Sequence, residues 1–281
     1  MISFSPVLEF YITNVCNLTC RGCNRFNNYN FKGHQRWADH ADVIEAWSKR
    51  ITADKLSIIG GEPTLNPDLE LWISNLRRLW PTVRIIVQTN GTYILPKFAM
   101  LSEKYQVTFV VSLHDVETSA KIIDEWKNLI GPSFKPFLPG FVFHQAAVIN
   151  KGDYFEVHNN NTQDAFSCCD MKHDHTIFNG KLFKCPSMAL LPEFKNQFDL
   201  RLSEHQQQLL SSFQPLSADC TDEQLQEFAS TRDTPISQCT FCPTNPSWGT
   251  ACGPEKQNLP TPDFDNYVTK INLFDYKKRL T

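Results

Sequence analysis

Short apolar runs alternate with helical periodicity through the first half of the sequence. Runs rich in Val, Ile, Phe and Tyr predict β-strands at Val7–Thr13, Lys55–Ile59, Val83–Thr89, Thr108–Ser112 and Phe141–Val148. Helical patterns lie between them, at about Asp39–Arg50, Pro67–Leu79, Pro96–Tyr105 and Thr118–Leu129. Strands that alternate with helices favour parallel βα units. We therefore expect an α/β fold, a partial (β/α) TIM-like barrel, with its chemistry on loops at the carboxyl ends of the strands.

The pattern changes in the second half of the chain. Thr176–Phe178 and Lys181–Phe183 flank Asn179-Gly180, a strong signal for a β-hairpin. Helical patterns follow at about Ser203–Phe213 and Asp222–Ala229. With 281 residues, the chain is long enough for a main domain and a small one. We expect the barrel at residues 1–155, a smaller domain built on the hairpin and helices at 156–255, and a C-terminal tail at 256–281.

Three cysteines follow the first predicted strand. Cys16, Cys20 and Cys23 have the spacing C-x3-C-x2-C. Fe–S clusters are normally held by four Cys thiolates. Three thiolates leave one iron of a four-iron cluster open to a small molecule. The alternatives are a structural zinc site with His34 as a further ligand, or buried thiols without a ligand.

A second motif follows the second predicted strand. Gly60-Gly61-Glu62-Pro63 contains two glycines, whose backbone can come close to a ligand. The alternative is a simple Gly-Pro turn. Together and in this order, the cysteine triplet and this motif resemble the radical S-adenosylmethionine (radical SAM) superfamily. Gly22 departs from the resemblance, because that superfamily usually has an aromatic residue there, and a contact with adenine is thereby weakened.

The resemblance implies a set of cofactors and site residues. A [4Fe–4S] cluster would bind Cys16, Cys20 and Cys23, and SAM would chelate its open iron. Reductive cleavage of SAM would give a 5′-deoxyadenosyl radical that takes a hydrogen atom from the substrate. A flavodoxin- or ferredoxin-type protein would donate the electron. The residues implied in SAM binding are Gly60, Gly61, Glu62, Pro63, Asn90 and Ser112, and His114 is a candidate catalytic residue where the family often has an acidic one.

The later cysteines predict a second metal centre. Cys185 follows the hairpin, and Cys239-Thr240-Phe241-Cys242 forms a C-x2-C pair. With Cys168 or Cys169 they give four ligands, enough for a saturated auxiliary [4Fe–4S] cluster. This half resembles the twitch domain, a shortened relative of the SPASM domain; an all-cysteine zinc ribbon is the alternative. Adjacent side chains on an extended segment point in opposite directions, so we favour Cys169 over Cys168.

Composition narrows the partners and the compartment. The net charge is −3 without a Lys/Arg-rich run, which argues against a nucleic-acid substrate. Ten cysteines without a signal peptide indicate a reducing, cytoplasmic setting. The longest apolar stretches have the length of strands, so we expect no membrane span.

These features favour an enzyme acting on a small polar molecule. Dehydrogenation or epimerisation of a sugar, aminocyclitol or nucleotide-derived metabolite is the first hypothesis. A dehydrogenase needs an electron acceptor, which the auxiliary cluster provides. An epimerase needs a hydrogen donor, for which Cys220 and Cys252 are candidate catalytic thiols. Glu9 and Tyr11 alternate on the first strand and are expected to face the barrel interior.

Two other hypotheses remain at this stage. The first is epimerisation or crosslinking of a ribosomally made peptide. Many such enzymes carry an additional N-terminal peptide-binding domain, and a first strand that begins near Val7 is expected to leave no room for one. The second is a non-enzymatic Fe–S or zinc scaffold, which would leave the Gly60–Pro63 motif without a task.

Overall fold

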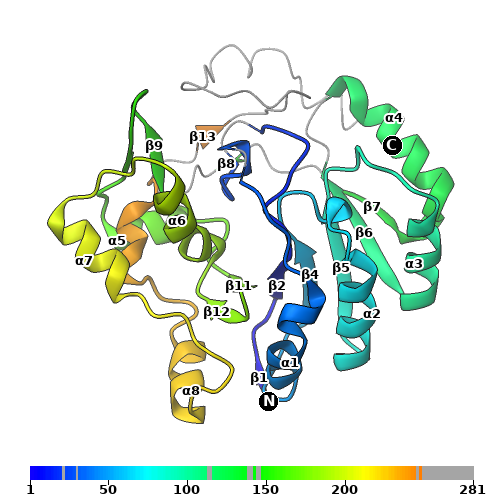
Figure 1. Cartoon of the computed structure of the whole chain (residues 1–281), viewed down its shortest axis with the longest axis horizontal. Helices are drawn as coiled ribbons and strands as arrows, with labels where there is room; N and C mark the ends of the chain where they lie inside the picture. Colours follow the sequence, from blue (N-terminus) through cyan, green and yellow to red (C-terminus); the bar gives the residue numbers. More distant parts are fainter. Residues whose placement is uncertain are drawn as a thin grey trace.

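A central sheet of seven strands organises the structure (Figure 1). The structure is a computed structural model that describes residues 1–20, 23–29, 31–112, 116–137, 142–143, 147–244 and 247–248. The strand order is β12-β11-β2-β4-β5-β6-β7, and every neighbouring pair is parallel except β11 with β12. The strands are β2 (Val7–Tyr11), β4 (Lys55–Ile59), β5 (Arg84–Thr89), β6 (Val107–Ser112), β7 (Phe134–Phe137), β11 (Asp174–Phe178) and β12 (Lys181–Phe183). Since β7 and β12 are edges of this sheet, the predicted partial barrel is confirmed.

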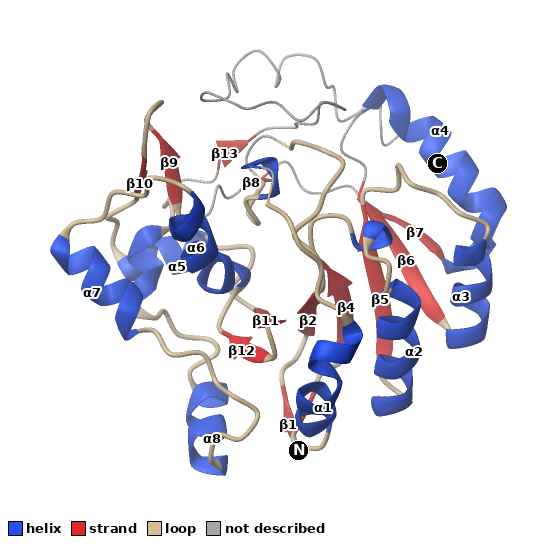
Figure 2. Cartoon of the chain, in the orientation of Figure 1, coloured by secondary structure: helices blue, strands red, loops and turns tan. Residues whose placement is uncertain are grey.

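Four helices cover the outer face of the sheet (Figure 2). They are α1 (Trp37–Ser48), α2 (Leu69–Leu79), α3 (Lys97–Tyr105) and α4 (Val116–Ile130). The main core lies between these helices and the strands, with Leu8 and Phe10 of β2 buried against them. The alternate residues of the same strand, Val7 and Glu9, therefore face the interior side, where a cavity lies.

The strand predicted at Phe141–Val148 does not take the fifth place in the main sheet, and residues 141 and 144–146 lie outside the described part of the chain. The neighbour of β6 is β7, whose Pro136 made it a poor strand candidate in the sequence. In the predicted range, β8 (Val142–Phe143) pairs antiparallel with β13 (Ser247–Trp248). The range also reaches the start of β9 (Val148–Asn150), which pairs antiparallel with β10 (Phe155–Val157). The apolar run is thus divided between two small two-stranded sheets.

The predicted hairpin is confirmed, and it belongs to the main sheet. Asn179 and Gly180 form its turn with φ of 49° and 72°, the left-handed backbone that such two-residue turns need. β11 continues the sheet beyond β2, with Thr176 beside Glu9. The boundary expected between residues 155 and 156 therefore does not separate two sheets.

The remaining elements lie mostly in the second half. The helices are α5 (Thr162–Cys168), α6 (Pro186–Gln197), α7 (Glu204–Ser212) and α8 (Asp222–Ser230), and the short elements are β1 (Ile2–Ser3), β3 (Ile51–Thr52), η1 (Asn27–Tyr29), η2 (Pro63–Leu65), η3 (Gly131–Ser133) and η4 (Ser237–Phe241). α7 and α8 match the predicted helices, and each begins with a capping box, at Ser203 and Thr221. α5 and α6 were not predicted, and α6 contains Pro192.

A second core joins the segment after the first three cysteines to α6. Phe26 lies 5.1 Å from Phe194 between ring centroids, and Tyr29 lies 5.2 Å from the same ring. Phe31, Phe155 and Phe198 complete this aromatic cluster. Its packing fixes the N-terminal loop against the C-terminal part of the chain. Among the helices within the described ranges, none is long and apolar enough to cross a membrane.

Candidate functional site

A cavity of about 540 Å³ lies on the interior side of the sheet. Its volume is within the usual range for ligand pockets, about 300–1,000 Å³. Its lining comes from the loop after β2, the loop after β4, and inward residues of five strands. The polar and cysteine residues of this lining include Glu9, Cys16, Cys20, Cys23, Asn24, Arg25, Asn27, Lys55, Ser57, Gln88, Thr89, Asn90, Ser112, Asp170 and Asp174.

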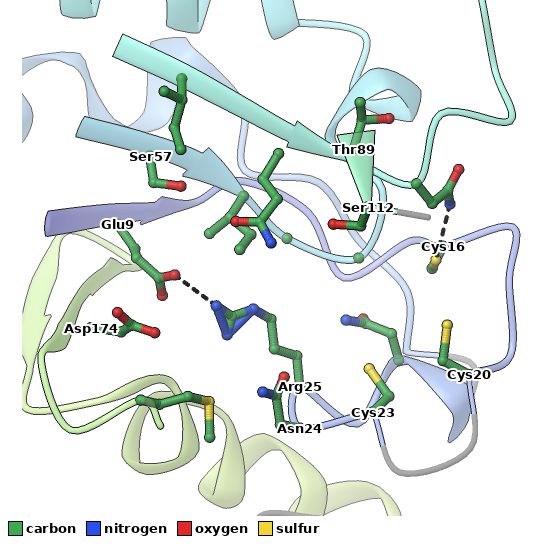
Figure 3. A pocket seen from close by; sticks show the side chains of 18 of the residues that line it. Glu9, Cys16, Cys20, Cys23, Asn24, Arg25, Ser57, Thr89, Ser112 and Asp174 are labelled. Atoms are coloured by element: carbon green, nitrogen blue, oxygen red, sulfur yellow. Dashed lines mark hydrogen bonds and ion pairs between the residues drawn. The ribbon is translucent and has the colours of Figure 1, made fainter. Parts of the chain in front are cut away.

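The three N-terminal cysteines lie together at one end of this cavity (Figure 3). Burial raises the pKa of Cys16 to about 12 and also raises the pKa of Cys23. Such thiols stay protonated until a bound cation draws the proton off. In the described residues, no three His, Cys, Asp or Glu side chains gather closely enough to hold a single metal ion. The thiols instead border a space, and this donor set fits a cluster larger than one ion.

Gly60 and Gly61 allow the loop after β4 to pack on the loop after β2, which carries Cys16, Cys20 and Cys23 and is called the cysteine loop below. A Cβ atom at Gly60 would lie 2.5 Å from the Thr13 carbonyl oxygen, and one at Gly61 would lie 2.3 Å from that of Val15. The Gly61 amide donates a 2.7 Å hydrogen bond to Thr13. Both glycines also line the cavity. Any larger side chain here would push the two loops apart.

Glu62 lies behind the cavity wall, where it joins two loops. Glu62, which the resemblance assigns to SAM binding, is fully buried. Neither Glu62 nor Pro63 is part of the cavity lining. One carboxylate oxygen accepts a 2.6 Å hydrogen bond from the Thr89 hydroxyl, and the other accepts a 2.7 Å bond from the Asn90 amide. Thr64 donates to it as well. Glu62 therefore ties the loop after β4 to the loop after β5.

Asn90 and Ser112, which the resemblance assigns to SAM binding, both line the cavity. The Asn90 side chain donates to Asn17 at 2.8 Å and lies 3.9 Å from the Cys16 sulfur. It therefore connects the end of β5 with the cysteine loop. Ser112 ends β6. His114 lies outside the described residues.

A polar wall of four residues stands opposite the thiols. It consists of Glu9 on β2, Arg25 on the cysteine loop, Ser57 on β4 and Asp174 on β11 (Figure 3). Arg25 and Glu9 form a buried 2.7 Å ion pair. Burial and the nearby Glu9 carboxylate raise the pKa of Asp174 to about 7. Of these four, the sequence indicated only Glu9. For Ser57, a hydroxyl side chain inside the apolar strand β4 was the available signal.

The four later cysteines line a second, smaller cavity. Cys169 follows α5, Cys185 precedes α6, and Cys239 and Cys242 lie in and after η4. Burial raises the pKa of Cys185 to about 11, and it raises the pKa of the other three as well. Lys172 and Lys184 also line this space, so two cations lie beside the four thiols.

Cys168 and Cys220, the other two cysteines among the described residues, are absent from both cavity linings. The Cys168 sulfur lies 2.8 Å from the Thr244 carbonyl oxygen, so the geometry agrees with Cys169 as the inward thiol. The Cys220 sulfur lies 3.4 Å from Arg50, beside the start of α8. The structure does not bring Cys220 to the polar wall, which does not fit a hydrogen donor to a substrate bound there. Cys252 lies outside the described residues.

Comparison with known proteins gives a family and several distant relatives. Residues 10–138 match the sequence model of the radical SAM superfamily. The chain is 29% identical over 156 residues to GTP 3′,8-cyclase of Aquifex aeolicus (strain VF5), a match that covers 52% of this chain and 48% of that protein. It is 26% identical over 133 residues to the S-adenosylmethionine-dependent nucleotide dehydratase of Flammeovirga pacifica, covering 45% of each. The chain thus spans about half the length of the curated relatives it matches.

One solved structure resembles most of the chain. The crystal structure of BtrN in complex with AdoMet and 2-DOIA superposes with a TM-score of 0.53 at 16% sequence identity. The superposition covers 86% of this chain and 94% of that one. At this identity the likeness concerns the fold alone, and it agrees with the partial barrel.

Proposed function

Because residues 10–138 match the radical SAM superfamily model, we propose that this chain is an enzyme of that superfamily that reductively cleaves SAM. A [4Fe–4S] cluster at Cys16, Cys20 and Cys23 would bind SAM and supply the electron that releases a 5′-deoxyadenosyl radical for hydrogen abstraction. The substrate is a small polar molecule. An electron donor of the flavodoxin or ferredoxin type and a reducing, cytoplasmic setting belong to the same proposal.

One observation carries this proposal: the three thiols and the polar wall border the same cavity. The cysteine loop holds the thiols at one end, and β2, β4 and β11 present the polar wall at the other. The wall itself is shielded from bulk water at Glu9, which is 3% exposed, and at Ser57, which is 2% exposed. A substrate held by the wall would thus be near the cofactor and shielded from other hydrogen donors.

We also propose an auxiliary [4Fe–4S] cluster in a twitch/SPASM-like unit within residues 156–255. Cys169, Cys185, Cys239 and Cys242 would be its ligands, and four thiols around one cavity support this assignment. A saturated cluster offers no open iron to a substrate. It would instead accept an electron, and this favours dehydrogenation of the substrate over epimerisation.

The test is anaerobic SAM cleavage by the reconstituted protein. With a chemical reductant, the intact chain should release 5′-deoxyadenosine and methionine. A variant with Cys16, Cys20 and Cys23 all changed to Ala should release neither. Cys168→Ser is the matched control, because that thiol lies outside both cavity linings, and it should retain cleavage. Cleavage by the triple variant would refute the proposal.

A second experiment separates dehydrogenation from epimerisation. In heavy water, a dehydrogenated product should carry no deuterium at carbon, because no hydrogen returns to the substrate. An epimerase with a thiol donor would place deuterium at the inverted carbon, since thiols exchange their hydrogen with solvent. Deuterium at a carbon of the product, together with loss of product formation in a Cys252→Ala variant, would favour epimerisation over dehydrogenation.

A further inference from the structure

Two buried side-chain atoms of the polar wall have no hydrogen-bond partner. Arg25 Nη1 and Ser57 Oγ are buried and unpartnered within the described part of the protein. The Arg25 side chain is 9% exposed, and its other terminal nitrogen is held by Glu9 at 2.7 Å. A buried donor without a partner costs about 1–3 kcal/mol, so such groups require an explanation. Both residues line the cavity.

A third incomplete group lies beside them. Asp174 is partly buried and lines the same cavity, and no hydrogen bond to its carboxylate occurs among the described residues. Figure 3 shows the Asp174 carboxylate beside Glu9 and on the same side of the cavity as the tip of Arg25. A partly buried carboxylate that faces a cavity is open to a donor from a ligand. The wall therefore has vacant hydrogen-bonding positions on three different elements.

The register of the sheet explains this grouping. Glu9 of β2 is paired with Ser57 of β4 on one side and with Thr176 of β11 on the other. Asp174 is two residues before Thr176, so the two side chains share one face of the sheet. The Thr176 hydroxyl donates a 3.1 Å hydrogen bond to the second carboxylate oxygen of Glu9, so both oxygens of that carboxylate have a partner. The pairing of Glu9 is thus satisfied within the protein, and the vacant positions surround it.

We infer that Arg25, Ser57 and Asp174 form a subsite for the hydroxyl groups of a neutral, phosphate-free polyol, such as a sugar or cyclitol. This inference rests on the proposed function, because it specifies that enzyme's substrate. Arg25 donates to a hydroxyl oxygen, Asp174 accepts from a hydroxyl, and Ser57 does either. A hydroxyl group both donates and accepts, so adjacent hydroxyls match this set.

The charges around the cavity exclude a phosphate at this wall. Its charged lining residues are Glu9, Asp170 and Asp174 with Arg25 and Lys55. Three acidic and two basic groups sum to −1 when all are ionised. Arg25 is already neutralised by Glu9, so a dianionic phosphate at this wall would find no surplus positive charge there. Phosphate sites instead use surplus Arg, Lys or backbone N–H groups.

Calorimetry on the anaerobically reconstituted, SAM-bound protein tests the subsite. The probes are myo-inositol, glucose and glucose 6-phosphate. We expect saturable binding of at least one neutral polyol, and weaker binding of glucose 6-phosphate than of glucose. Asp174→Ala and Ser57→Ala should each lower the affinity for the neutral probe about tenfold, since one hydrogen bond to the probe is lost. Ser102→Ala removes a buried serine hydroxyl that the cavity lining does not include, and it should bind like the intact protein.

Each contrary result would overturn the subsite. Absence of saturable binding by both neutral probes would mean that the wall is merely hydrated. An affinity equal to that of the intact protein in both Ser57→Ala and Asp174→Ala, or tighter binding of glucose 6-phosphate than of glucose, would also exclude it. Release of 5′-deoxyadenosine is measured in parallel. SAM cleavage without polyol binding refutes the subsite alone, and polyol binding without SAM cleavage refutes the proposed function alone.

Discussion

At the scale of the residue, buried polar side chains divide into two kinds. Glu62 is fully buried, and its carboxylate accepts hydrogen bonds from three residues. His175 is also fully buried, yet neither of its ring nitrogens has a partner within the described part of the chain. A buried group with hydrogen-bond partners, such as Glu62, fixes the position of neighbouring loops. A buried titratable group without partners, such as His175, makes the stability of the fold depend on pH. Each leads to a prediction.

Glu62→Gln should disturb SAM binding indirectly. The amide keeps the shape of the side chain but puts an NH₂ where the carboxylate accepts from Thr89 or Asn90. We expect a loss of about 2 kcal/mol in stability, typical of a hydrogen bond to a buried charge. SAM affinity should fall about tenfold while the iron at the first three cysteines remains. Equilibrium binding of SAM and iron analysis measure both, and Glu103→Gln on the exposed side of α3 is the control. Unchanged SAM affinity would show that this tie between the loops is dispensable.

His175→Phe should make the protein more resistant to acid. The ring lies between Phe4 and Phe228, with centroids 5.0 Å and 6.0 Å away, and burial lowers its pKa to about 4. The unfolded chain has an ordinary pKa near 6.5 and takes up a proton first, so stability falls as the pH drops from about 6.5 towards 4. At pH 5 this loss is about 2 kcal/mol relative to pH 7. Thermal unfolding at both pH values should show a smaller difference in the variant than in the intact protein.

The control for that experiment is His205→Gln. His205 is exposed on α7, so its replacement should leave the pH dependence unchanged. If His175→Phe melts with the same pH dependence as the intact chain, the buried ring does not carry the effect.

At the scale of the element, the strands that could be predicted are those with an uninterrupted apolar pattern. β2, β4, β5 and β6 agree with their predicted ranges to within two residues at each end. β7 escaped prediction because Pro136 interrupts a four-residue strand. Only tertiary pairing explains why it occurs, since β6 supplies its hydrogen-bonding partner. The sequence indicated the hairpin turn but not its place in the sheet, which long-range pairing with β2 decides.

The same distinction applies to the site. Motif spacing predicted the cysteines, glycines, Asn90 and Ser112 that line the first cavity. Arg25 and Asp174 lie far apart in the sequence and meet only because β11 lies next to β2. Glu62 was assigned to the ligand, whereas its hydrogen bonds are to the protein. A motif thus indicates which residues matter, but the packing around each residue decides what it contacts.

The aromatic cluster gives a prediction at the scale of the helix. Phe194→Ala removes a fully buried ring from α6 that contacts Phe26 and Tyr29 on the segment after the cysteines. The cost should be about 3–5 kcal/mol. The cysteine loop should loosen, so the variant should also retain less iron at the first site. Thermal melting and iron analysis measure the two effects.

Phe98→Ala is the matched control for the aromatic cluster. Phe98 of α3 is equally buried but packs against Phe109 of β6 and Trp126 of α4. We expect a comparable loss of stability with full iron content. Equal iron loss in both variants would show that general destabilisation, and not the contact with the cysteine loop, is responsible.

At the scale of the whole molecule, two sets of thiols border two separate cavities. If each set holds a four-iron cluster, the reconstituted protein should contain about eight irons. Replacement of either set by alanines should leave about four, because the sets share no residue. Replacement of Cys168 by Ser should leave about eight. Iron and zinc analysis decides this, and about four irons with one zinc would refute the auxiliary cluster while the first remains.

The position of β11 beside β2 also has a consequence for the order in which the protein can form. Thr176 donates to Glu9 across 167 residues of sequence. A ribosome adds about 5–20 residues per second, so β11 is synthesised roughly 10–30 s after β2. During that interval one edge of the nascent sheet has exposed backbone groups, which readily pair with other chains. Emergence of the hairpin pairs the edge of β2, moves the sheet edge to the three-residue strand β12, and completes the polar wall, so the pocket and the shorter exposed edge arise together.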